Sequence, residues 1–150
     1  MKKSPKELKL EEMLRSSKIV ADGFLGGDTR GVPEIIEADA ASLSELKKTA
    51  KQVAARMQEV TDVAKASLGD WTIVDEKRSA KVDEAKGGII CPWGHYGAFA
   101  KRVTTVRFLE TDETIQWSDL SIHFIGEHEF FQGKGSAYRI EPKKLVKIIF

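Results

Sequence analysis

The sequence predicts an α+β fold, in which an antiparallel β-sheet of about three to five strands packs with helices. Helical periodicity fills most of residues 1–69, whereas alternating, β-branched segments dominate residues 70–150. Polar turns join several of the expected strands directly, which favours antiparallel pairing. A chain of 150 residues can bury roughly two-thirds of its unfolded surface. We therefore expect residues 1–150 to form a single domain.

A capping box opens the first expected helix. Ser4-Pro5-Lys6-Glu7 combines a capping serine, a proline at the first helical position and a glutamate three residues after the cap. It predicts a helix that runs to about Ser16. A short strand is expected over residues 18–21, and a glycine-rich turn over residues 22–28.

The longest helix is expected at the end of this helical half. Pro33 opens a short helix that ends near Ala38. Ser42-Leu43-Ser44-Glu45 is a second capping box, and the helix that it opens ends before Gly69. Its apolar stripe either packs within the chain or forms a homodimer seam. The stripe consists of Leu46, Ala50, Val53, Met57, Val60 and Ala64.

Strands and turns alternate after residue 70. Residues 71–74 and 80–85 flank a polar turn and predict a hairpin, which Gly87-Gly88 breaks off. A long strand rich in valine and threonine is expected over residues 99–109. A second polar turn returns the chain through residues 114–117.

The last expected elements are mostly helical. Ser118 is the predicted N-cap of a helix that runs to about Gln132, with Gly133 as its stop. A short strand is expected over residues 138–140, before a closing helix over residues 143–149.

Composition excludes several classes of protein. The formal net charge of +1 gives no global reason to bind nucleic acid or an anionic membrane. No apolar run reaches the roughly 20 residues that cross a bilayer. The first residues lack the apolar segment of a secretory signal, and a single cysteine forms no internal disulfide. We therefore expect a cytoplasmic protein.

The only cysteine and all three histidines lie between residues 91 and 128. They are Cys91, His95, His123 and His128. Thiolate and imidazole are the ligands that zinc prefers, and four of them can close a tetrahedral site. The expected position is the junction between the sheet and the helix that Ser118 opens.

The geometry of an ideal helix indicates which of these residues can share one metal ion. Asp119, His123 and Glu127 recur every four residues and form one ridge. His128 lies about 140° around an ideal helix from His123, so one metal ion cannot easily take both. The predicted set is therefore Cys91, His95, His123 and Glu127, with His128 as an alternative.

The role of such a site stays open at this stage. A closed site would hold the fold, whereas an open position would support hydrolysis, with Glu127 or Asp119 as the catalytic general base. Trp93 and Tyr96 are expected to wall a ligand pocket beside it. Neither Cys-x3-His nor His-x4-His matches a strong zinc motif. Under the alternative interpretation these residues are ordinary core and surface groups, so enzymatic activity is not decided.

The competing function is a non-catalytic module. Lys101, Arg102 and Arg107 share one expected strand, and an aromatic loop precedes them. Such a surface could bind a partner protein or nucleic acid, and the intervening acidic residues disfavour nucleic acid. Two glycine-rich loops match no phosphate-binding motif, so no phosphate site is predicted.

Overall fold

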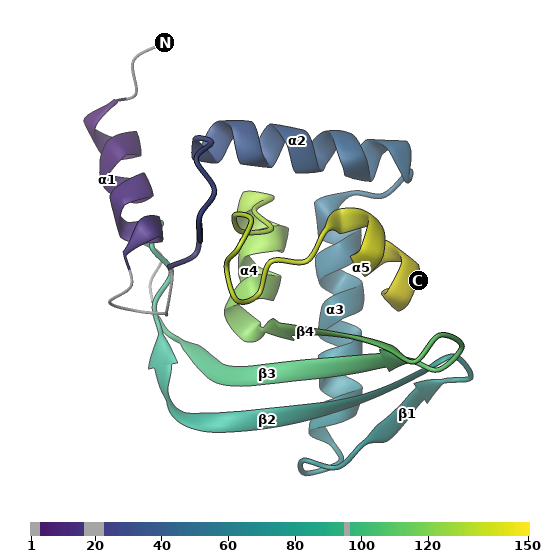
Figure 1. Ribbon diagram of the computed structural model, residues 1–150. Coiled ribbons are helices and arrows are strands. Elements are labelled where there is room, and N and C mark those ends of the chain that lie inside the picture. The colour runs from purple at the N-terminus through teal and green to yellow at the C-terminus, as the bar shows by residue number, and fades with distance from the viewer. Residues whose placement is uncertain (1–3, 17–22, 95–96) are drawn as a thin grey trace.

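The computed structural model describes residues 4–16, 23–94 and 97–150. Within these residues, five α-helices gather on one side of a four-stranded antiparallel sheet (Figure 1). Helices occupy the N-terminal part and strands lie in the C-terminal half, as predicted. The α+β prediction is therefore confirmed.

Three helices come first in the described chain, four strands follow, and two helices come last. In order they are α1 (Pro5–Arg15), α2 (Val32–Glu45), α3 (Ala50–Lys65), β1 (Thr72–Asp75), β2 (Arg78–Ile89), β3 (Phe99–Phe108), β4 (Glu113–Ser118), α4 (Asp119–His128) and α5 (Pro142–Ile149). The strands lie in the sheet in this same order, and each is antiparallel to its neighbours.

The predicted break at Gly87-Gly88 is wrong, because β2 continues through it to Ile89. The pairing of β2 with β3 shifts register between Ala85 and Gly88, and Gly87 has a φ of 95°. Glycine adopts this backbone conformation at little cost, so the pair forms a bulge rather than an end. The bulged strand then delivers the chain to Cys91.

Two predicted helix boundaries are also wrong. The helix from Pro33 does not stop near Ala38, and Ser42 lies inside it, where its hydroxyl donates to the carbonyl of Ala38. The long helix starts instead at Thr49, whose side chain accepts from the backbone N–H of Gln52 in a reciprocal capping box. The segments that start at Ser42 and at Thr49 both have the sequence of a capping box, but only the box at Thr49 begins a helix.

The apolar stripe of α3 packs within the chain. Val53, Met57, Val60 and Ala64 are fully buried in the main core, together with Trp117 from β4. Because this stripe is covered by the chain's own sheet and helices, it cannot also serve as a dimer seam.

The chain after β4 departs from prediction in two places. Helix α4 ends at His128, not near Gln132, because Glu129 adopts a left-handed backbone conformation. Residues 138–140 form no strand. The Arg139 side chain there pairs with Asp39 and donates to the carbonyl of Gln132, which ties this segment to α2 and the loop after α4. Helix α5 forms where expected, whereas residues 18–21 lie outside the described residues.

Two apolar clusters share the interior. The main core lies between the sheet, α3 and α5. The second cluster joins α1, α2 and α4 and contains Cys91, Phe124 and Phe130. The candidate site borders this second cluster.

Among the described residues, no helix is both long and apolar enough to cross a membrane.

Candidate metal centre

Two segments bring the candidate ligands together. Cys91 follows the last residue of β2 by two positions. His123 and His128 both lie on α4, whose start is fixed by the Ser118 cap accepting from the Ser121 backbone N–H. The sheet and the cap therefore set the relative position of the thiol and the two imidazoles.

The ligand atoms of Cys91, His123 and His128 all lie within 4.8 Å of one another. The Cys91 Sγ is 3.6 Å from His128 Nε2, and the two imidazole centroids are 5.1 Å apart. Cys91 is buried, with 2% of its surface exposed, whereas both histidines are half-buried. A thiol and two imidazoles at these separations can hold one metal ion.

The expectation that one ion cannot take both His123 and His128 does not hold for this geometry. The angle of about 140° describes where the Cα–Cβ bonds point on an ideal helix, whereas the ring nitrogens lie beyond them. His128 is also the last residue of α4. The imidazole planes meet at 81°, edge to face, so the rings converge even though their attachment points diverge.

Aromatic rings hold both imidazoles in place. Trp93 stacks on His128, with 4.0 Å between centroids and 11° between planes. Phe99, the first residue of β3, lies 4.4 Å from the His123 ring. Trp93 also contacts the edges of Phe124 and Phe130. The sequence pointed to Trp93, but it gave no signal that Phe99 would pack on His123, since the pair is joined only by the fold.

The Cys91 segment is a tight turn. The backbone N–H of Gly94 donates to the Cys91 carbonyl at 3.0 Å, and Gly94 has a φ of 87°. Burial raises the pKa of the Cys91 thiol, and a hydrogen bond from the Trp93 backbone partly opposes this rise. A cation beside the sulfur would supply the compensation that a buried thiolate requires.

Asp119 and Glu127 lie along a neighbouring cleft. They line it together with His123, Gln58 and Phe99, and the cleft has a volume of about 370 Å³. Asp119 accepts from Arg102 Nη1 at 2.6 Å, while burial, the larger effect, raises the pKa of its carboxyl. Glu127 is exposed and does not belong to the group of converging ligand atoms.

His95 and Tyr96 lie outside the described residues. The structure therefore places Cys91, His123 and His128 together and sets Asp119 and Glu127 beside His123.

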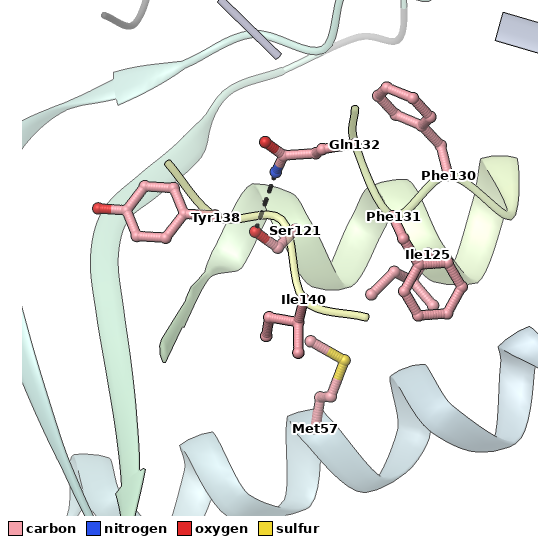
Figure 2. A pocket seen from close by; sticks show the side chains of 8 residues that line it. All are labelled: Met57, Ser121, Ile125, Phe130, Phe131, Gln132, Tyr138 and Ile140. Carbon is pink, nitrogen blue, oxygen red and sulfur yellow. Dashed lines mark hydrogen bonds between the residues drawn. The ribbon is translucent and has the colours of Figure 1, made fainter. Parts of the chain in front are cut away.

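A different cavity is too small to hold a ligand. It lies between α3, α4 and the segment after α4, where Gln132 Nε2 donates to Ser121 Oγ (Figure 2). Its volume of about 10 Å³ is at most that of one water probe. The cavity therefore reflects packing around Met57 and Ile140.

The arginine side chains of the basic strand, β3, lie close to carboxylates. Arg102 binds the carboxylates of Glu84 and Asp119, and Arg107 lies near Asp112 while its guanidinium covers the Trp71 ring. Lys101 is exposed. Since carboxylates accompany both arginines, this strand presents little uncompensated positive charge.

Comparisons with models of protein families, with curated proteins and with solved structures found no match for the chain.

Proposed function

We propose that the protein binds a zinc-like divalent metal ion through Cys91, His123 and His128. The observation that carries this proposal is the convergence of their three ligand atoms within 4.8 Å, although Cys91 and His128 are 37 positions apart in the chain. One thiolate with two imidazoles suits zinc better than the harder, oxygen-seeking cations. The neighbouring rings of Trp93 and Phe99 support the imidazole orientations that binding requires.

Three protein ligands leave one position of a tetrahedral ion for a fourth group. In a structural site we propose His95 as that group, because it follows Cys91 by four positions in the sequence. In a hydrolytic site the position is filled by water. The two versions differ in what the loss of His95 does to metal affinity.

The cleft beside His123 supports the hydrolytic version. Glu127 is exposed along it and can accept a proton from water, whereas Asp119 is held by Arg102. We therefore assign the general base to Glu127. In this version the proton of the water would pass to the Glu127 carboxylate while the water oxygen bonds to the substrate's acyl carbon. The bond from that carbon to the leaving group then breaks, and Glu127 returns its proton to the leaving group.

Competition with a chromogenic chelator tests metal binding. Cys91→Ser, His123→Ala and His128→Ala are each expected to weaken zinc binding by at least about tenfold, while Glu129→Gln leaves it unchanged. Zinc affinity that is equal in all four variants would contradict the proposal.

His95→Ala then separates the two versions. A structural site loses zinc affinity by about tenfold or more in this variant, whereas a hydrolytic site keeps it. For the hydrolytic version, zinc-loaded protein should cleave p-nitrophenyl acetate, and Glu127→Gln should lower the rate by about a hundredfold without releasing zinc. If the zinc-loaded protein does not cleave the ester, the hydrolytic version is wrong and only the structural version remains.

A further inference from the structure

A second concave surface lies away from the cleft beside His123. We call it the α1–α2 groove: its floor is formed by Leu10, Val32, Pro33, Ile36 and Trp93, and its volume is about 460 Å³. The groove is lined mainly by residues of α1 and the first turns of α2. These two segments lie at the upper left of Figure 1. A concave surface with an apolar floor is the kind of feature that binds apolar side chains of a ligand or partner.

Among the residues that the structure describes, every charged one that lines the α1–α2 groove is acidic. Glu7 and Glu11 come from α1, Glu37 from α2, and Glu129 follows α4. Glu11 is buried and accepts from the Val32 backbone N–H at 2.9 Å, so it joins α1 to α2. The other three are exposed and give the rim its negative charge.

We propose that the α1–α2 groove binds a helical segment of a partner protein that carries leucine-like side chains flanked by lysine or arginine. The apolar side chains of such a segment enter the floor at the spacing i, i+3, i+4. Its cations meet Glu7, Glu37 and Glu129, which also steer its approach. An acidic segment or an anionic membrane surface is repelled by the same rim.

Trp93 connects this groove to the candidate metal centre. One indole forms part of the groove floor and also stacks on His128. A bound segment therefore touches the aromatic wall of the metal centre without touching a ligand. The peptide-binding proposal does not depend on metal, because the groove is formed by α1, α2 and Trp93.

Fluorescence anisotropy with a labelled 14-residue peptide of leucine and lysine, arranged with helical periodicity, tests the proposal. We expect saturable binding at micromolar peptide and none with the matched leucine and glutamate peptide. Binding should weaken by about tenfold when salt is raised to about 0.5 M, because the rim charges are solvent-exposed. Equal binding of both peptides would overturn the proposal.

Matched triple variants locate the binding. Glu7→Gln with Glu37→Gln and Glu129→Gln should weaken the basic peptide by at least about tenfold. The control combines Glu12→Gln, Glu34→Gln and Glu110→Gln, which removes three exposed carboxylates that do not line the groove. If the two triple variants weaken peptide binding equally, the effect comes from net charge alone. That result would contradict binding in the groove.

A floor variant tests the apolar part. Ile36→Ser keeps every charge and should weaken the peptide by about fivefold or more. Unfolding curves for the variant establish that the fold survives. Unchanged binding, or self-association of the unmodified protein that the peptide does not reverse, would show that a peptide is the wrong occupant.

Discussion

The indole ring of Trp93 lies face to face with the imidazole of His128, 4.0 Å away and only 11° from parallel. The Nε2 atom of the same imidazole lies 3.6 Å from Cys91 Sγ. A half-buried histidine at the end of a helix has several rotamers open to it. The stacked indole selects the one that aims Nε2 at the thiol.

This stacking gives the first prediction. Trp93→Ala should weaken zinc binding about tenfold, since groups that orient a ligand typically matter to that extent. Trp93→Phe should retain most of the affinity because a flat ring remains. Trp71→Ala is the matched control, because that indole lies near Arg107 and Lys81 on the sheet. Equal affinity in the Trp93→Ala and Trp71→Ala variants would show that the stacking does not orient His128.

The second prediction concerns two adjacent glycines. A Cβ on Gly26 would lie 2.4 Å from the backbone of Gly135, and Gly26 has a φ of 55°. A Cβ on Gly27 would meet nothing within 4 Å. Gly26→Ala should therefore lower the free energy of unfolding by about 3 kcal/mol, and Gly27→Ala by less than about 1 kcal/mol. Urea unfolding measures both, and equal losses would contradict this packing of the two loops.

The third prediction concerns a buried hydroxyl network. Trp117 Nε1–H donates to Thr61 Oγ1 at 2.9 Å, and the Thr61 and Thr104 hydroxyls are 2.7 Å apart. Thr61→Val keeps the shape but leaves two buried polar groups unsatisfied, so it should cost about 2 kcal/mol of unfolding free energy. Thr105→Val, on the half-buried side of the same strand as Thr104, is the control. A cost of less than about 0.5 kcal/mol would show that the network does not stabilise the fold.

The fourth prediction is a pH dependence. Hydrogen bonds from Arg30, whose side chain is 2.7 Å away, and from the Lys134 backbone hold the pKa of Asp28 well below its usual value near 4. A lowered folded-state pKa stabilises the protein above the unfolded value, and that stability is lost as pH falls below about 4. Asp28→Asn should cost about 3 kcal/mol at pH 7, because the Asp28 side chain is almost fully buried.

The cost of Asp28→Asn should shrink progressively as the pH is lowered from about 4 to 2.5, where the unfolded chain takes up the proton. Chemical unfolding at pH 7, 4 and 2.5 measures it. Asp83→Asn, at a side chain that is 68% exposed, is the comparison and should change little. A cost for Asp28→Asn that is the same at all three pH values would contradict the assigned ion pair.

Local signals in the sequence predicted the elements that depend on neighbouring residues. Ser4 and Ser118 cap α1 and α4 as expected, because their partners lie three residues away. The same logic failed at Ser42, since Thr49 and Gln52 offer an equivalent box and the chain turns at Lys47, which has a φ of 58°. Packing of α2 and α3 in different directions decides between the two, and no local pattern contains that information.

The sequence likewise predicted some features of the candidate site and not others. The clustering of cysteine and histidine was visible in the sequence, and so was the ridge that places Asp119 and Glu127 beside His123. The convergence of His128 was not, because it depends on where α4 ends and on Trp93, 35 positions earlier. An ideal-helix projection describes backbone directions and omits the reach of the imidazole.

X-ray absorption at the zinc edge of the zinc-loaded protein tests the central proposal most directly. Binding through Cys91, His123 and His128 predicts one sulfur at about 2.3 Å and at least two imidazole nitrogens at about 2.0 Å. The sulfur shell should vanish in Cys91→Ser, and one nitrogen should be lost in His128→Ala. A spectrum with only oxygen and nitrogen neighbours, unchanged in Cys91→Ser, would contradict the proposed site.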